Sequence, residues 1–586
     1  MPKIVSFMEI LDSDILILGT GIAGFTSALH ASEASGKLRI SMISKLHAMR
    51  SHSVAAEGGI SGVLYPGADS KEMHAYDTIK GSDYLADQDA VELLAENAPG
   101  EIKFFDHIGV PWNRSDEGKI QQRPFGGMSS PRTAFAADKT GFFMMRALYD
   151  ESTSRGNIDI FHEHFATKLL IINRKLMGAF AFDMATGEEK IFRAKACIIA
   201  TGGASRTFGF TTTSYSTTGD GTAMAYREGI PLKNMEFVQF HPTGLVPSGI
   251  LITEAARGEG AYLINSKGER FMADYAKSKM ELAPRDIVSR AIITEINKGN
   301  GLKEEDSGME HVLLDLRHLD KDVINVKLPM VKELTMKMLD LDPSKEPIPV
   351  RPVAHFTMGG IHTDINGRIL MADGKPLAGA WAIGEAGCVS VHGANRLGSN
   401  SLSQCSVWGR LAGKAAADYS LNYNGNIAED ERSIMDIASG ESARISSMLS
   451  SKGTKTPYDI RERLCAEMDK DMYVFRTSEG MAAAEKAVLG FMREFKDIYI
   501  EDKGSVYNTN LRDALETENL LTLAYAIIVS AKPRLESRGA HAMVEYPKRD
   551  DSNWLKHTLV YKQGEGYSIS YIPVKITRWK PEERRY

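Results

Sequence analysis

The chain opens with a short run of branched apolar residues that leads into a glycine-rich turn. Residues 14–18 read Asp-Ile-Leu-Ile-Leu, the pattern of a strand buried on both faces. Gly19-Thr-Gly21-Ile-Ala-Gly24 follows, then a helix-forming stretch to about Ser35 and a second strand over 38–44. This order predicts a dinucleotide-binding βαβ unit, because the glycines allow close backbone approach and the helix N-terminus offers free N–H groups to a pyrophosphate.

Strand patterns further along the chain predict that the nucleotide-binding fold is interrupted by an insertion and then continues. An apolar strand over 195–200 and another short strand before Gly384-Glu385 are typical of a nucleotide-binding fold that continues after long insertions. Charged helical stretches alternate with short strands such as 312–316, which indicates a smaller inserted domain able to close over a cleft. We therefore expect an α/β fold with a Rossmann-like domain (1–248 and 362–426), an inserted α+β capping domain (249–361), a helical domain (427–533) and a C-terminal domain (534–586).

Composition narrows the range of partners. The 586 residues carry 70 Lys and Arg against 76 Asp and Glu, a formal charge of −6, so no general basic surface is available for a phosphate backbone and nucleic acid is not expected as a main partner. The apolar stretches 15–29 and 520–531 are shorter than the ~20 residues of a membrane-spanning helix. Residues 1–13 leave no room for a signal or transit peptide, which predicts an intracellular protein.

The spacing of the four cysteines indicates whether this chain could hold an electron-carrying cluster. All four lie far apart, without a C-x-x-C pair, so we expect neither a metal site nor an iron–sulfur cluster in this chain. Any one-electron carrier is expected on another protein.

Two features after the second strand concern the cofactor. The residue expected to bind the ribose hydroxyls is usually acidic, but here Ser44-Lys45 occupies the position, which leaves NADP, with Lys45 near a 2′-phosphate, as an alternative to FAD. His52, in Arg50-Ser-His-Ser, follows where a flavin or nicotinamide ring would lie. From chemistry alone, a structural and a functional role for His52 are equally plausible.

Five further segments place cationic or hydroxyl donors beside glycine or proline. A single segment of this kind is typical of an ordinary surface loop, but together they suit a small dianion, because arginine engages a carboxylate through two parallel bonds. These segments contain His241, Thr253 with Glu254 and Arg257, Arg285, His355, and Arg396.

At these residues the chain closely resembles the flavoprotein subunit of succinate dehydrogenase and fumarate reductase. The resemblance covers nearly the whole chain and rests on long motifs. Besides the five donor segments, these are Gly19-Thr-Gly-Ile-Ala-Gly24, Ser44-Lys45, Arg50-Ser-His-Ser53, Ala56-Glu-Gly-Gly59, Arg123-Pro-Phe-Gly-Gly127, Phe135-Ala-Ala-Asp-Lys-Thr-Gly141, Ala200-Thr-Gly-Gly203, Thr218-Gly-Asp-Gly221, Arg534-Leu-Glu-Ser-Arg-Gly-Ala-His541 and Asp550-Asp-Ser-Asn-Trp-Leu-Lys-His557.

The resemblance implies FAD rather than NADP, and a set of roles. His52 matches the histidine joined covalently to the flavin, Arg285 the residue that exchanges a proton with substrate, and Glu254 and Arg257 its proton-supplying neighbours. His241, Thr253, His355 and Arg396 match the residues that bind the two carboxylates. The implied cofactor-binding residues are Gly19, Gly21, Ile22, Ala23, Gly24, Ser44, Lys45, Ser51, His52, Ala56, Gly58, Gly59, Asp220, Glu385, Ser401 and Leu402.

The resemblance also implies the setting of the reaction. It predicts succinate–fumarate interconversion, an iron–sulfur partner subunit and a membrane anchor subunit, with the assembly on the cytoplasmic face of a prokaryotic membrane. L-aspartate oxidase is a similar alternative, but it lacks the flavin-linking histidine and the Asn553–His557 ending; a flavin-containing scaffold without turnover is a second. Glu57 stands where many members have Gln, which places a possible negative charge near the flavin and leaves the favoured direction open.

Overall fold

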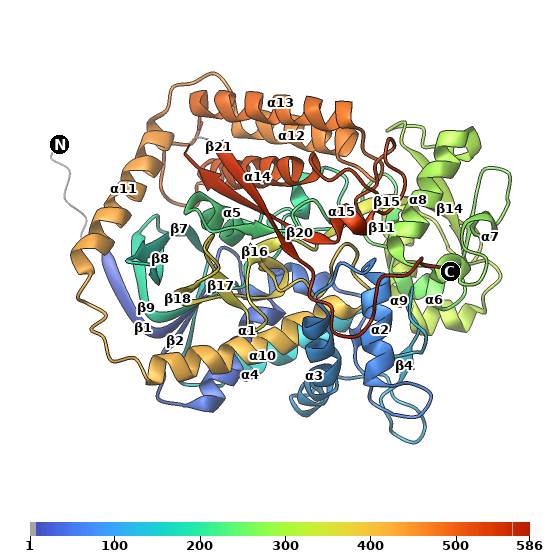
Figure 1. Cartoon of the computed structure of the whole chain (residues 1–586), viewed down its shortest axis with the longest axis horizontal. Coiled ribbons are helices and arrows are strands. Elements are labelled where there is room, and N and C mark those ends of the chain that lie inside the picture. Colours follow the sequence, from blue (N-terminus) through green and yellow to red (C-terminus); the bar gives the residue numbers. More distant parts are fainter. Residues whose placement is uncertain (1–7, 565) are drawn as a thin grey trace.

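The computed structural model describes residues 8–564 and 566–586, and Figure 1 shows their arrangement. Strand β1 (Glu9–Leu18) lies in the largest sheet, parallel to both β2 (Ile40–Ser44) and β9 (Glu189–Ile199). Helix α1 (Ile22–Ala34) connects β1 to β2, and Ile15, Ile17 and Leu18 are at most 2% exposed. The predicted βαβ unit is therefore confirmed, with its first strand buried on both faces.

The same sheet is completed by segments from much later in the chain. Its order is β17-β18-β8-β9-β1-β2-β6, with β7 paired to β8. Strand β18 (Pro376–Ala382) runs parallel to β9, so the nucleotide-binding fold does resume after an insertion. The remaining strands are β6 (Ile158–His162), β7 (His164–Ile172), β8 (Lys175–Asp183) and β17 (Arg368–Leu370).

Helices cover this sheet and the glycine turn. Helix α10 (Asn400–Leu421) packs closely against α1: a Cβ on Gly413 would lie 2.3 Å from the carbonyl oxygen of Ser27, so only glycine allows this approach. The other helices of this part are α2 (Lys71–Gly81), α3 (Gln88–His107), α4 (Thr140–Thr153) and α5 (Asp220–Arg227), beside a small sheet of β3 (Ile60–Ser61), β4 (Gln122–Arg123) and β5 (Thr133–Ala134).

The inserted segment is built around a second sheet, in the order β11-β15-β14-β12 with β13 paired to β14. Strand β11 (Val238–Leu245) precedes the predicted boundary at 248/249, yet it pairs antiparallel with β15 (Ile348–Thr357) of the inserted segment. The domain boundaries themselves stay a prediction. The other elements are α6 (Glu254–Gly258), β12 (Tyr262–Ile264), α7 (Met272–Tyr275), α8 (Arg285–Glu295), β13 (Leu302–Lys303), β14 (Glu310–Asp315) and α9 (Pro329–Leu339).

The C-terminal third combines helices with a returning hairpin. Helices α12 (Pro457–Asp471), α13 (Ser478–Glu494) and α14 (Thr509–Ala531) lie together as orange and red ribbons in the upper part of Figure 1, and α11 (Glu431–Ser450) lies at its left edge. After the short α15 (Asp551–Trp554), strands β20 (Lys556–Gln563) and β21 (Gly566–Pro573) join a sheet with β10 (Leu232–Lys233), β16 (Gly360–His362) and β19 (Gly387–Cys388). The last segment is thus integrated with earlier parts of the chain.

Among the described residues, α14 is the one helix whose length and apolar composition would allow it to cross a membrane. Its apolar window is 89% buried within the protein, as is typical of a core helix. Residues 1–7, part of the short N-terminal segment considered in the sequence, lie outside the described residues.

Candidate active site

A cavity of about 590 Å³ extends from the glycine turn to the inserted segment, a size typical of cofactor sites. Its lining includes every predicted cofactor-binding residue except Gly24. A Cβ on Gly24 would lie 2.1 Å from the carbonyl oxygen of Gly19, so this glycine allows α1 to pack on the turn. Of the predicted substrate and catalytic residues, only Arg257 does not line the cavity.

The glycine turn presents bare backbone to this cavity. Gly19 adopts φ +108°, and a Cβ there would lie 2.3 Å from the carbonyl oxygen of Ala200, so no other residue fits. Gly21 precedes α1 without a capping side chain. The N–H of Ile22 donates to Ser53 Oγ at 3.3 Å, so the N–H groups that follow it in the first turn of α1 are the ones offered to an anion, and this cradle fits the pyrophosphate of a dinucleotide.

The surroundings of Lys45 favour FAD over NADP. Its ammonium group lies 2.8 Å from Thr218 Oγ1, 2.8 Å from Asp220 Oδ2 and 2.7 Å from Glu516 Oε1. These contacts use all three N–H groups of the ammonium and neutralise its charge. Lys45 is therefore not available to pair with the 2′-phosphate of NADP. Glu516 comes from α14 and carries no sequence signal for this role.

His52 lies in a short 3₁₀ turn, His52–Ala55, that follows the second strand. Its Nδ1 accepts a hydrogen bond from the backbone N–H of Ser214 at 3.4 Å. Burial lowers the pKa of His52 to about 4, so the imidazole is neutral at pH 7 and retains a nitrogen lone pair. Its position in the cavity lining and its neutral state are both compatible with attachment to a cofactor.

Four donors meet at the inner end of the cavity. His241 on β11 and His355 on β15 come from paired strands, with ring centroids 5.1 Å apart. Thr253 caps α6, and Arg396 lies over the Phe356 ring at 4.6 Å. His241 Nε2 and Arg396 Nε are buried, and neither has a hydrogen-bond partner among the described residues. Because a buried unpaired donor costs free energy, such atoms indicate a site prepared for an acceptor ligand.

Burial controls the protonation of these donors. It lowers the pKa of both His241 and His355 well below the usual range, and nearby Arg285 adds to this effect. The histidines are therefore neutral at pH 7 and act as hydrogen-bond donors without a charge. The formal positive charge at this end of the cavity comes from Arg285 and Arg396.

Arg285, Glu254 and Arg257 form a chain of buried charges beside the donors. Arg285 begins α8, and its Nε donates to Glu254 Oε2 at 2.7 Å. Arg257 Nη2 lies 3.7 Å from the same carboxylate oxygen, and in the part of the chain that the structure describes neither Nε nor Nη2 of Arg257 has a hydrogen-bond partner. Burial alone would raise the pKa of Glu254, but Arg285 and Arg257 lower it to about 2, so this carboxylate is ionised at pH 7.

Two polar residues that the sequence argument did not select hold these groups in place. Gln239 accepts from Arg285 Nη1 at 3.1 Å and donates to the carbonyl oxygen of Arg396 at 2.7 Å. Thr212 Oγ1 lies 2.7 Å from His355 Nδ1. Gln239 is two residues before His241 on one strand, so strand alternation could have identified it. Thr212 offers no comparable signal.

The charge expected for the Glu57 carboxyl group from the sequence is not the one that the structure favours. It is 9% exposed, and its Oε2 has no hydrogen-bond partner within residues 8–564 and 566–586. Burial, together with the nearby Asp138, raises the pKa of Glu57 well above its usual range despite Arg123. The structure therefore favours an uncharged carboxyl group where the sequence suggested a negative charge.

The glycine cradle and the adjoining anion pocket together define an FAD-binding flavoprotein. A family model described as "FAD binding domain" matches residues 14–402, and one described as "Fumarate reductase flavoprotein C-term" matches residues 461–586. The chain belongs to the family of succinate dehydrogenase and fumarate reductase flavoprotein subunits.

Relatives and solved structures agree over nearly the full length. The chain is 42% identical to the fumarate reductase flavoprotein subunit of Mycobacterium tuberculosis, covering 98% of this chain and 99% of the relative. It is also 42% identical to the succinate dehydrogenase flavoprotein subunit of Rickettsia bellii, over 97% and 96%. Quinol fumarate reductase from Escherichia coli superposes with a TM-score of 0.94 at 40% identity, over 98% and 99% of the two chains. The predicted fold class and family are thus confirmed.

Proposed function

We propose that this chain is the catalytic flavoprotein subunit of a complex that interconverts succinate and fumarate. The observation that carries the proposal is the group of buried, unpartnered nitrogen donors at the inner end of an FAD-sized cavity. A C4 dicarboxylate would supply the acceptors that these donors lack. L-aspartate oxidase is the weaker alternative, because relatives that are 42% identical over nearly the full chain are named as fumarate reductase or succinate dehydrogenase subunits.

The donor residues bind and orient the substrate. His241, Thr253, His355 and Arg396 would hold its two carboxylates, which fixes its length and direction relative to the cofactor. Donors concentrated at one carboxylate would also polarise the adjacent double bond. A bound FAD supplies hydride exchange at its N5 atom.

Arg285 would exchange the proton on the second reacting carbon. Guanidinium rarely gives up its proton, so neutral arginine must not accumulate. The ionised Glu254, 2.7 Å from Arg285 Nε, holds no proton of its own, so it would act as a relay: it would accept a proton from Arg257, whose Nη2 lies 3.7 Å from the same carboxylate oxygen, and pass it to Arg285. Arg257 would in turn be reprotonated from outside the pocket. Arg285, Glu254 and Arg257 thus form the proposed proton path.

His52 would carry the flavin covalently. The bond would join a ring nitrogen of the neutral imidazole to the flavin 8α-methyl carbon; one methyl C–H proton and the ring N–H proton would be lost, and the two electrons would remain on the flavin. An electron-withdrawing substituent on the flavin would favour its reduced form, which would assist succinate oxidation. Mass spectrometry of the denatured, FAD-loaded chain tests this: the flavin should remain on the peptide that contains His52, and its loss on denaturation would refute the link.

The partners follow from the reaction. Within the described residues no cluster of His, Cys, Asp and Glu is arranged to hold a metal, and electrons must nevertheless reach or leave the flavin. We infer an iron–sulfur subunit and a membrane anchor subunit, with this chain peripheral on the cytoplasmic face of a prokaryotic membrane. Co-purification of the tagged chain from its native membranes tests this; recovery without an iron–sulfur protein would refute it.

A spectroscopic experiment tests the substrate. The flavin of the purified chain is reduced without oxygen, fumarate is added, and the return of oxidised flavin absorbance is followed. Rapid return with fumarate, but not with fumaramide, is the expected result. No return with intact bound flavin would refute the assignment, and iminoaspartate would then be tested for the aspartate oxidase alternative. A flavin without turnover or any dicarboxylate-dependent spectral change would favour the scaffold alternative.

A further inference from the structure

The last residues of the chain run over the surface as a strap, which we define as residues 575–586. Near its start, Gln88 Oε1 accepts hydrogen bonds from the backbone N–H groups of Thr577, Arg578 and Trp579, at 3.0, 2.9 and 3.0 Å. Gln88 Nε2 donates to the carbonyl oxygen of Trp579 at 2.6 Å. In Figure 1 the red trace passes α3 and α2 and ends beside the green inserted segment. The strap therefore joins two parts of the fold.

Arg584 makes the contact at the far end of the strap. Its Nη2 donates to Asp83 Oδ2 at 2.9 Å and to Asp286 Oδ2 at 2.5 Å, and its Nη1 donates to Asp286 Oδ1 at 3.3 Å. The side chains of Arg584, Asp83 and Asp286 are 8%, 6% and 1% exposed. This is a buried two-sided ion bridge, whose partners are costly to leave unpaired.

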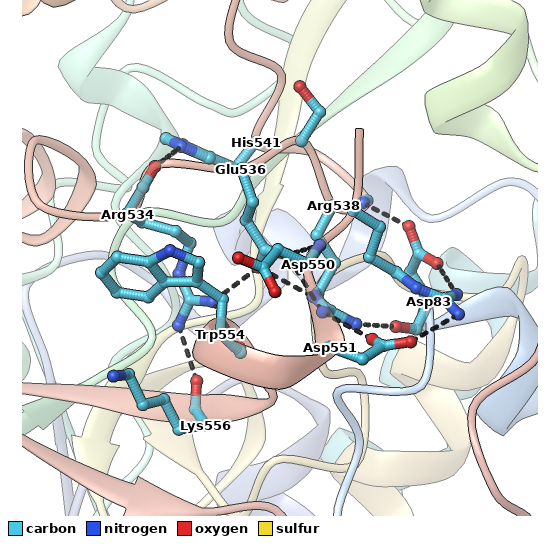
Figure 2. Close-up of polar contacts among 12 residues, drawn as sticks. Asp83, Arg534, Glu536, Arg538, His541, Asp550, Asp551, Trp554 and Lys556 are labelled. Carbon is cyan, nitrogen blue, oxygen red and sulfur yellow. Dashed lines mark hydrogen bonds and ion pairs between the residues drawn. The ribbon is translucent and has the colours of Figure 1, made fainter. Parts of the chain in front are cut away.

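Asp83 is a fixed anchor for this bridge. Its Oδ1 accepts from Arg549 Nη1 at 2.8 Å, and its Oδ2 accepts from the backbone N–H of Gly539 at 2.9 Å. Its carbonyl oxygen accepts from Arg538 at 2.9 Å, and Figure 2 shows Asp83 beside Arg538 in this network. Because these contacts fix the side chain of Asp83, its ion pair with Arg584 also fixes the Arg584 guanidinium. That guanidinium in turn restrains the side chain of Asp286.

Asp286 is the neighbour of Arg285 in the first turn of α8. Successive side chains leave a helix about 100° apart, so one turn can direct these two side chains to different partners. Arg285 contacts Glu254 and Gln239 inside the site, whereas Asp286 contacts Arg584. The rotation of this turn about the helix axis is thus restrained both from the pocket and from the strap.

We propose that Arg584 is a positioning residue for the reaction: through Asp286, the strap holds the first turn of α8 so that Arg285 keeps its place against Glu254. The part of this inference that concerns turnover rests on the proposed role of Arg285. The part that concerns α8 does not depend on turnover, and can be measured separately.

The test compares Arg584→Gln with Arg585→Gln in the full-length, FAD-loaded chain. Arg585 is a matched control, because its side chain is 87% exposed and its one side-chain partner among the residues that the structure describes is Glu583. Hydrogen exchange is measured at the amides of Ile287 and Val288, which both bond to the carbonyl oxygen of Pro284. We expect at least about tenfold faster exchange there in Arg584→Gln, unchanged exchange at Ile15–Leu18, and wild-type behaviour in Arg585→Gln.

Fumarate reduction provides the second measurement. We expect kcat of Arg584→Gln to fall at least about tenfold while KM and the Kd for succinate stay within about threefold, since the carboxylate donors are untouched. Equal α8 exchange and equal kcat in the two variants would overturn the proposal. A wild-type chain without turnover would refute the proposed function, while the exchange measurement would still decide the role of the strap.

Asp286→Asn provides an independent variant if Arg584→Gln yields no folded flavoprotein. It keeps the contact of Arg584 with Asp83 and removes the charge on α8. Faster exchange at Ile287 and Val288 is again expected, and exchange equal to that of the wild-type chain would overturn the proposal.

Discussion

Two regions of this molecule bury arginines in opposite ways. In the C-terminal network, Arg534 and Arg538 are fully buried, and every guanidinium nitrogen has a partner. In the pocket, Arg396 is 3% exposed, yet its Nε has no hydrogen-bond partner among the described residues. Arg257, which lies beside the pocket and does not line it, is 2% exposed and likewise leaves two nitrogens unpartnered. Figure 2 shows the satisfied case, with Arg534 and Arg538 on either side of Glu536.

The difference separates structural charge from functional charge. A buried cation whose partners belong to the chain contributes to the fold, because the cost of desolvating it is met by fixed acceptors. A buried cation with free N–H groups is held in place at a cost to stability, and that cost is recovered when an anionic ligand binds. Burial alone therefore does not indicate the role of an arginine, and the ligand-binding role proposed for Arg396 rests on its unpartnered Nε together with its place in the cavity lining.

Arg285→Gln is expected to have the largest effect. Glutamine keeps a polar side chain at this position but cannot supply a proton, so fumarate turnover should fall by about 10³-fold or more. Flavin attachment and part of the dicarboxylate affinity should remain. Steady-state kinetics with parallel succinate titration of the flavin spectrum checks both; near-normal turnover in Arg285→Gln or Arg285→Lys would refute the assignment of Arg285 as proton donor.

Arg534→Gln probes the satisfied network. Its removal leaves Glu236 and Glu536, both fully buried, with fewer partners, so the free energy of unfolding should fall by about 3–5 kcal/mol. Arg463→Gln breaks an exposed pair with Glu494 and should cost at most about 1 kcal/mol. Denaturant titration of both variants measures this contrast, and equal losses would contradict the distinction between the two regions.

Arg396→Gln tests the pocket, where we expect a loss of ligand affinity and not a loss of stability. Without ligand, the free energy of unfolding should stay within about 1 kcal/mol of the wild-type value or rise, because an unpaired buried cation is removed. The Kd for succinate should rise about 30- to 100-fold, equivalent to about 2–3 kcal/mol. A destabilisation as large as that of Arg534→Gln, with unchanged affinity, would show that Arg396 is structural.

Glu57→Gln is expected to have the smallest effect. Because burial and Asp138 raise the pKa of Glu57 well above its usual range, an uncharged carboxyl is replaced by an uncharged amide. The flavin midpoint potential at pH 7 should shift by less than about 30 mV, the equivalent of about 1.4 kcal/mol for two electrons. A larger rise, measured by anaerobic dye equilibration, would show that Glu57 carries a negative charge near the flavin.

Local patterns predicted much of the fold and the site. The glycine turn, the strand before it and the helix after it were predictable because backbone geometry at Gly19 and the run Ile15–Leu18 depend on neighbouring residues. The donor segments were recognisable because each places its histidine or arginine beside small residues. Strand alternation on β11 would also have indicated Gln239.

Other contacts could not be read from local patterns. Lys45 is neutralised in part by Glu516, which is 471 residues away in the sequence, and the bridge from Arg584 to Asp286 spans 298 residues. No period or motif links such positions, and each partner alone resembles an ordinary surface charge.

The sequence by itself therefore determined the nucleotide-binding unit, the order of the main segments and the candidate anion donors, whose role stays a prediction. The tertiary structure alone decided which of these charges are paired, which nitrogens are left for a ligand, and which carboxyl groups keep their protons. The physical reason is that secondary structure follows from short-range backbone preferences, whereas the pairing and pKa of a buried charge depend on what distant segments bring within a few ångströms of it.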